Sequence, residues 1–276
     1  MTLLLTEIWR YPVKSCRGQR LTDAVVEPWG LAGDRRWMVV DGDGRFVTAR
    51  EHPRLVLVTP TPEAGAVRFA APGLPDLVVA APDPGDTGLV PVRVWSSELD
   101  AAAASDEAGR WLSKAIGVDV NLVYLDDPTR RPTDREYSEA GDVVSFADGY
   151  PLLLTSEDSL AQLNEWIAGG SHAAEGPLPM TRFRPSVVVA GASAFAEDGW
   201  RLVKIGDVTF RVVKPCARCV LTTVDPDTAV KGKEPLATLA RRRRRNGKVL
   251  FGVNLIPDAP RAGARLRAGD PVEVLG

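Results

Sequence analysis

Short alternations of hydrophobic and polar residues run through the chain and predict β-strands more often than long helices. In the first half they indicate seven strands: Leu3–Trp9, Leu21–Glu27, Arg36–Asp41, Phe46–Thr48, Leu55–Thr59, Val67–Ala70 and Val90–Trp95. The sequence Asp-Gly-Asp-Gly at 41–44 is typical of a hairpin turn, because glycine tolerates the positive φ of a tight turn. Proline and glycine interrupt residues 60–91 so often that we expect mostly loop there.

Helical spacing of apolar residues occurs at three places and predicts three helices. They are Ser105–Ile116 with Ser105 as N-cap, Ser156–Ile167 with Thr155 or Ser156 as N-cap, and Leu236–Arg245 ended by Asn246-Gly247. The rest of the second half predicts strands: Tyr150–Thr155, Pro185–Ala190, Arg201–Ile205, Val208–Val213, Val220–Val224, Gly252–Ile256 and Pro271–Leu275. The pattern therefore indicates a mainly β protein with some α+β elements.

A polar stretch without periodicity, Asp126–Asp142, is the best candidate for a domain boundary. At 276 residues the chain is long enough for two domains that share a cleft. We therefore expect one domain over residues 1–125 and a second over residues 126–276.

Composition narrows the class of partner. The chain is 45% hydrophobic and 25% charged, with a formal net charge of −2, so nothing indicates general attraction to nucleic acid or an anionic membrane. The amino terminus, MTLLLTEIWRYPVKS, lacks the basic start of a signal peptide, and no apolar run approaches the length of a membrane span. The five arginines at 241–245 suit a solvated helix end. We expect a cytoplasmic monomer that acts on a small molecule.

The densest chemical signal is KPCARCVLTTVDP, which places Cys216 and Cys219 three residues apart. A zinc site would need more ligands than the chain offers nearby, and a thioredoxin-like pair should open a helix rather than the predicted strand. Buried structural cysteines are a third interpretation, but Arg218 is a permanent cation that favours a thiolate at Cys219. Three cysteines form no disulfide framework, so such a thiolate is available as a ligand for a soft metal or as a nucleophile in sulfur chemistry.

Other polar clusters lie far from the cysteines in sequence. Lys14 and Ser15, together with Arg35 or Arg36, offer the donors that clamp a phosphate, although no P-loop spacing is present. Thr155-Ser156 at a helix start and Phe183-Arg184-Pro185-Ser186 before a strand are weaker candidates. Two carboxylates stand beside aromatic residues at Phe195–Trp200, where an ordinary turn is the simpler interpretation.

In this order the motifs resemble those of proteins in which an N-terminal β-barrel domain precedes a molybdenum-cofactor-sulfurase C-terminal (MOSC) domain. That family includes mitochondrial amidoxime-reducing components and bacterial reductases of N-hydroxylated compounds. The resemblance runs from YPVKSC through FRPSVVVAG, AEDGW and PCARCVLTTVDP to FGVNLI and GDPVEVL, and PCARCVLTTVDP is its most specific part. It implies a β-barrel-like domain, a MOSC β-barrel domain and a cofactor cleft between them.

The resemblance also implies a site. Cys219 would ligate molybdenum, Cys216 would support it, and Asp198 would be a candidate proton donor. The molybdenum cofactor, a metal bound to molybdopterin, would be contacted by Lys14, Ser15, Arg35, Thr155, Ser156, Arg184, Ser186, Ala217, Arg218 and Asn254. Ala217 offers only its backbone, and relatives often carry Asn at the position of Ser186 and Tyr at that of Asn254.

The implied activity is a molybdenum-dependent oxidoreductase that reduces N-hydroxylated or N-oxide-type small molecules. No cysteine run is spaced for an iron–sulfur cluster, so electrons would come from a separate ferredoxin, flavodoxin or cytochrome-type partner, and pyridoxal phosphate is not expected. The alternative is a sulfur carrier that holds a persulfide on Cys219. The phosphate-clamp residues distinguish the two functions, since a simple sulfur carrier would not need them.

Overall fold

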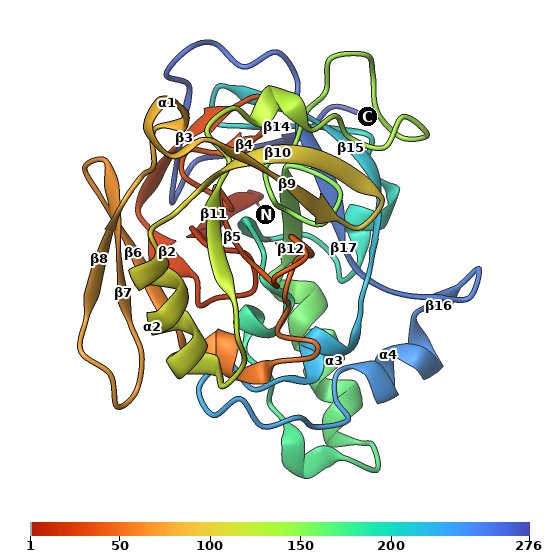
Figure 1. The fold of residues 1–276 in the computed structure, drawn as a ribbon. Coiled ribbons are helices and arrows are strands. Elements are labelled where there is room, and N and C mark those ends of the chain that lie inside the picture. Colours follow the sequence, from red (N-terminus) through yellow and green to blue (C-terminus); the bar gives the residue numbers. More distant parts are fainter. Residues whose placement is uncertain (1) are drawn as a thin grey trace.

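The computed structural model describes residues 2–276 as a mainly β protein built around one large twisted sheet (Figure 1). Eight strands follow the order β19-β14-β15-β17-β12-β13-β1-β2, and β16 pairs with β17 beside this path. Among the named strands of residues 2–276, β12 and β13 are the one pair that runs parallel, while the other pairs are antiparallel. The strands are β1 (Leu4–Arg10), β2 (Gln19–Leu21), β12 (Leu152–Ser156), β13 (Val187–Ala190), β14 (Leu202–Ile205), β15 (Val208–Ala217), β16 (Arg244–Arg245), β17 (Lys248–Pro257) and β19 (Val272–Val274). The sheet thus combines strands from both expected domains, and the boundary at 125/126 stays a prediction.

Three smaller sheets lie outside this large one. The first has the order β5 (Trp37–Val40), β11 (Asn121–Tyr124), β10 (Ser97–Ala103), β9 (Leu89–Val94), and the second has the order β18 (Arg265–Arg267), β3 (Asp23–Glu27), β4 (Gly30–Leu31). The third contains β6 (Thr59–Glu63), β7 (Ala66–Ala70) and β8 (Leu77–Ala80), followed by the short helix α1 (Pro84–Thr87).

The prediction of mostly loop over residues 60–91 is therefore wrong. Two prolines, Pro60 and Pro62, lie in β6 at the edge of its sheet, where a missing N–H is tolerated. The buried side chains of Val67, Phe69 and Val79 anchor the neighbouring strands to the core. Alternation over four or five residues was too short to stand out among so many prolines and glycines.

The three predicted helices are present, with one change. Ser105 caps α2 (Asp106–Ile116) by accepting the Ala108 N–H, and Ser156 caps α3 (Glu157–Ala168) in the same way. The third helix, α4 (Leu236–Arg242), ends earlier than predicted, because residues 244–245 pair with β17 as β16. Asn246 and Gly247 both have positive φ and form the hairpin turn instead of a helix cap. No helix among residues 2–276 has the length and apolarity needed to cross a membrane.

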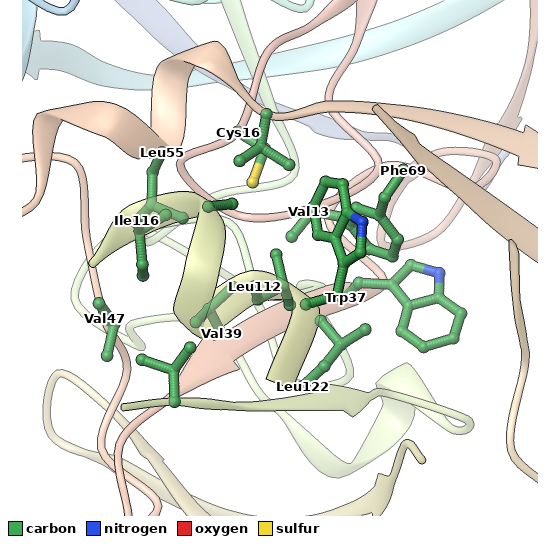
Figure 2. Packing of buried hydrophobic residues seen from close by; sticks show 14 of the residues in the cluster. Val13, Cys16, Trp37, Val39, Val47, Leu55, Phe69, Leu112, Ile116 and Leu122 are labelled. Atoms are coloured by element: carbon green, nitrogen blue, oxygen red, sulfur yellow. The ribbon is translucent and has the colours of Figure 1, made fainter. Parts of the chain in front are cut away.

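Buried side chains from α2, the neighbouring strands and the segment after β1 form the core shown in Figure 2. Leu112 and Ile116 of α2 pack there with Leu55, which lies in the 3₁₀ helix η1 (Pro53–Leu57) where a strand was predicted. Cys16 is fully buried in the same cluster, and burial raises its pKa to about 12. Cys16 therefore stays a neutral thiol that packs as a small apolar side chain.

Gly252 illustrates how tightly the central strands pack. Its φ is +73°, and a Cβ added there would lie 2.6 Å from the carbonyl oxygen of Leu154 on β12. We expect Gly252→Ala to lower the free energy of unfolding by about 2–4 kcal/mol, because it combines a left-handed backbone with overpacking. Denaturant unfolding measures the change. Gly199→Ala is the control, since a Cβ there meets nothing within 4 Å, and an equal loss in both variants would contradict the expectation.

Candidate functional site

A cavity opens where the end of β15 approaches the segment after β1 and the segment before β12. Its lining includes nine of the twelve residues predicted for the site: Lys14, Ser15, Arg35, Arg184, Ser186, Ala217, Arg218, Cys219 and Asn254. The remaining lining residues are Thr48, Arg50, Ala147, Asp148, Gly149, Tyr150, Pro151, Leu152, Leu153, Arg182, Phe183, Cys216, Leu221 and Thr222. Residues far apart in sequence thus converge on one place, as the resemblance implies.

Three predicted residues do not line this cavity. The side chains of Thr155 and Ser156 are fully buried, and the Ser156 hydroxyl caps α3. Asp198 is buried in an ion pair with Arg243, away from the cavity lining. Contact with a ligand stays a prediction for each of these three residues.

Cys219 lies where β15 has ended and a 3₁₀ helix, η6 (Val220–Thr223), begins. The predicted strand at 220–224 is wrong, because the hydroxyls of Thr222 and Thr223 donate to the carbonyls of Cys219 and Val220, three residues back. These bonds close a tight turn. The turn leaves the Cys219 side chain on the cavity lining.

The cation beside Cys219 is Arg50, which the sequence did not indicate. Its Nε donates to the Cys219 Sγ at 3.1 Å, and its Nη2 donates to Asp148 Oδ2 at 2.8 Å. The guanidinium also lies over the Trp95 ring, 4.4 Å from the centroid. Asp148 and the Trp95 ring hold Arg50 in place, so its hydrogen bond to the Cys219 sulfur has a fixed direction. A hydrogen bond donated by a cation stabilises a thiolate.

Arg218, which precedes Cys219 in the sequence, contacts the sulfur of Cys216 instead. Its Nη1 lies 3.0 Å from the Cys216 Sγ, and its Nη2 donates to the Phe183 carbonyl at 2.6 Å. The sequence indicated Arg218 as the cation that favours a thiolate at Cys219, but the hydrogen bond to the Cys219 sulfur comes from Arg50. All three cysteines are free.

Lys14 lies on the cavity lining, with 5% of its side chain exposed. Its Nζ donates to the Phe146 carbonyl at 2.8 Å and to Asp148. Burial lowers the pKa of Lys14 to about 8, although Asp148 opposes that change. Desolvation by the surrounding side chains would raise the pKa of Asp148, although 57% of its side chain is exposed, but Lys14 and Arg50 outweigh it and hold that pKa well below its ordinary value. Asp148 is therefore an anion at neutral pH.

Three residues of the cavity lining have a strained backbone. Ser15, Arg35 and Arg184 all have left-handed backbones, with φ of 68°, 46° and 55°. Each such non-glycine residue costs about 1–3 kcal/mol and persists only where the surrounding structure fixes it, typically at ligand sites. Three of them lining one cavity indicate that side-chain placement there outweighs local backbone preference.

Positive charge exceeds negative charge in the lining. Six cations, Lys14, Arg35, Arg50, Arg182, Arg184 and Arg218, face one carboxylate, Asp148. Arg35 pairs with Asp34 and Arg182 with Asp225, both outside the lining, while Lys14 and Arg50 share Asp148. Within residues 2–276, Arg184 and Arg218 have no ion pair with a carboxylate. A cleft with this imbalance attracts an anionic ligand.

The guanidinium of Arg184 is held by an aromatic ring instead of a carboxylate. It lies 4.2 Å from the centroid of Tyr11, and Arg35 lies 4.3 Å from the same centroid. Burial lowers the pKa of Arg184, and nearby Arg35 adds to this effect. Two guanidiniums that share one ring repel each other, and an anion between or beside them would relieve that repulsion.

The pKa of Lys14 gives a pH-dependent prediction. We expect the affinity of the cavity for sulfate, whose charge is constant between pH 7 and pH 9, to fall as pH rises through about 8 and Lys14 loses its proton. The stability of the fold changes with pH in the opposite direction. Below pH 8 the buried Lys14 ammonium lowers the free energy of unfolding, and this penalty disappears as pH rises from 8 to the ordinary lysine pKa of 10.5.

Isothermal titration calorimetry of metal-free protein at several pH values measures this dependence. Lys14→Met is the matched control, because any slope that it retains belongs to other groups. Equal pH profiles for wild type and Lys14→Met would contradict the assignment of the step to Lys14.

Comparison with known proteins gives the class of this molecule. Residues 2–119 match the MOSC N-terminal beta barrel domain, and residues 141–273 match the MOSC domain. The chain therefore belongs to the family of proteins that join these two domains, which confirms the resemblance drawn from the sequence motifs.

Relatives within this family cover nearly the whole chain. Mitochondrial amidoxime-reducing component 1 of Mus musculus is 34% identical over 289 residues, covering 99% of this chain and 82% of that protein. The Homo sapiens component 1 is 33% identical, covering 99% and 83%, and the Rattus norvegicus component 2 is 36% identical, covering 97% and 82%. The similarity therefore extends through both halves of the fold.

Proposed function

We propose that this protein binds a molybdenum cofactor through the Cys219 thiolate and reduces N-hydroxylated small molecules with electrons from a separate protein. The observation that carries the proposal is one cavity that combines a free thiol, held by Arg50, with an excess of cations. The names of the relatives, amidoxime-reducing components, support the substrate class.

The residues of the cavity fit such a cofactor. Molybdopterin carries a phosphate, and Lys14, Ser15, Arg35 and Arg184 supply the cations and the hydroxyl that bind one. No group of three or more His, Cys, Asp or Glu side chains within residues 2–276 is placed to hold a metal. A soft thiolate beside a cation, as Cys219 would be next to Arg50, suits a metal that brings most of its own ligands with it. When bound, the cofactor supplies two-electron redox chemistry that amino acid side chains lack.

The reaction breaks the N–O bond of the substrate. An N-hydroxylated amidine takes up two electrons and two protons and leaves as the amidine and one molecule of water. Asp148 is ionised at the cavity, with 57% of its side chain accessible, and an anion there can accept hydrogen bonds from the amino groups of the substrate and pair with the cationic product. Arg50 holds the Asp148 carboxylate and the Cys219 sulfur in fixed relative positions. Asp198 has no role in the proposed reaction, because it forms an ion pair with Arg243 outside the cavity lining.

An external electron donor is part of the proposal. The 276 residues contain three cysteines, one fewer than a Cys₄ iron–sulfur cluster needs. This supports a ferredoxin, flavodoxin or cytochrome-type donor outside these residues. The cytoplasmic location and the monomeric state stay predictions.

The test is to purify the chain from a host that makes molybdenum cofactor and to measure molybdenum and pterin per chain. Reduction of benzamidoxime by chemically reduced methyl viologen then measures the activity. We expect about one metal per chain and amidine as the product. A folded protein without metal or pterin would overturn the proposal, and a stable persulfide on Cys219 in that protein would support the sulfur-carrier alternative instead.

A further inference from the structure

The arginine run at 241–245 forms a surface that the proposed reaction does not use. Its exposed members lie at the end of α4 and on the β16–β17 hairpin, which projects from the body of the molecule at the right of Figure 1. We call Arg241, Arg242, Arg244, Arg245 and Lys248 the basic hairpin patch. Arg243 is not part of it, because its side chain is buried and pairs with Asp198 over the Phe195 ring.

Like charges are held together in this patch with little compensation. Arg245 lies directly opposite Lys248 in the antiparallel register of the hairpin, an arrangement that is destabilising. Within residues 2–276, Asp198 is the only carboxylate that forms an ion pair with a residue of the patch. It lies 3.6 Å from Arg245 and is already bound to Arg243. A solvated helix end, as predicted from the sequence, does not account for cations on a projecting hairpin.

The patch is joined directly to the segment that carries Cys219. The Arg218 N–H donates to the Val249 carbonyl at 2.7 Å, and Ala217 lies opposite Leu250 in the β15–β17 register. The strand that begins at Lys248 therefore passes beside the two residues that precede Cys219. A molecule docked on the hairpin would lie next to the site.

Two exposed apolar side chains follow Cys219 in the sequence. Val220, the next residue, is 41% exposed, and Val230, in the turn after η6, is 65% exposed. Transient protein interfaces combine a small apolar contact with charges that steer the partner and set its orientation. The arrangement here is of that kind, with cations on this side of the interface.

We propose that the basic hairpin patch docks the acidic face of a small electron-carrier protein and thereby places its redox centre beside Cys219. This inference rests on the proposed function, which requires such a donor. Charge complementarity selects an acidic protein, and the strand that starts in the patch runs beside the residues before Cys219, so a protein bound there would be close to the site. The near-zero net charge of the whole chain, −2, favours this partner over nucleic acid.

The test compares two charge-reversal variants of the cofactor-loaded protein. Arg244→Glu/Lys248→Glu alters the patch, and Arg110→Glu/Lys114→Glu makes the same change of charge on exposed positions of α2, away from β16 (Figure 1). Benzamidoxime reduction is driven either by an acidic [2Fe–2S] ferredoxin or by reduced methyl viologen. Binding of the oxidised ferredoxin is measured separately by biolayer interferometry at low and high salt.

We expect the patch variant to lose about tenfold or more in kcat/KM with ferredoxin at low salt, with little change at high salt and none with viologen. The α2 variant should match the wild type with both donors. Unchanged ferredoxin turnover and binding in the patch variant, or an equal loss in both variants, would overturn the docking surface.

Two further outcomes are informative. A wild type that is inactive with viologen, yet binds ferredoxin through the patch, would overturn the proposed reaction while supporting the docking surface. Tighter, salt-dependent binding of duplex DNA than of ferredoxin, abolished by Arg244→Glu/Lys248→Glu, would overturn the electron-carrier assignment in favour of nucleic acid.

Discussion

Cys219→Ser is expected to reduce benzamidoxime turnover by about a hundredfold or more, because it replaces the soft sulfur ligand that Arg50 contacts in the cavity. Loss of an outer partner of a metal ligand typically costs 10–100-fold, so loss of the ligand itself should cost at least as much. Molybdenum per chain and the metal's X-ray absorption spectrum, together with turnover, measure the effect.

Cys216→Ser is the matched control for this prediction. It makes the same chemical change in the same cavity, but the Cys216 thiol contacts Arg218 and not Arg50. We expect that variant to keep its metal and most of its turnover. Full molybdenum and full activity in Cys219→Ser, or losses in Cys216→Ser of the same size, would show that Cys219 is not the ligand.

The part of the site that follows from the sequence consists of residues in specific local strings. Lys14 and Ser15, and Ala217 to Cys219, each stand together in a motif, and all of them line the cavity. Their residue types also indicate the chemistry, since a thiol next to clustered cations suits a soft metal or sulfur chemistry. The local strings therefore predict which residues meet, although not how each one is bonded.

Arg50 and Asp148 could not be found in this way. Arg50 acts on Cys219 across 169 residues of sequence and on Asp148 across 98 residues, and neither stands in a recognisable motif. Their roles arise only when the fold brings three separate segments together. Without the contact between Arg50 and Cys219, the sequence pointed to the neighbouring Arg218 as the cation beside that thiol.

The fold shows the same limit at its turns. Asn246-Gly247 is compatible with both a helix end and a hairpin turn, and the pairing of residues 244–245 with β17 decides between them. Val220–Val224 looks like a strand because two threonines and two valines favour one. The threonine hydroxyls instead donate to the backbone carbonyls three residues back, and the segment forms η6. Local propensity therefore predicts the strands and helices with long periodicity better than the short segments that shape the site.

Arg184→Gln is expected to change stability and cofactor binding in opposite directions. Arg184 has no carboxylate partner within residues 2–276 and shares the Tyr11 ring with Arg35, so its removal relieves repulsion in the empty protein. We expect the Tm of cofactor-free protein to rise by about 2–4 °C, as a gain of about 1 kcal/mol would produce. The left-handed backbone at 184 contributes little to the difference, because glutamine and arginine tolerate it about equally.

The affinity for the cofactor should fall in the same variant by about 10–100-fold, since a charge-assisted hydrogen bond contributes roughly 1.5–3 kcal/mol. Calorimetry of protein from a host without molybdenum cofactor, and reconstitution with isolated cofactor, measure the two effects. Arg182→Gln is the control, because Arg182 also lines the cavity but pairs with Asp225 at 2.9 Å and should lower the Tm when removed. If Arg184→Gln also lowered the Tm and left cofactor affinity unchanged, Arg184 would be a structural residue. The excess charge of the cavity would then no longer support an anionic ligand.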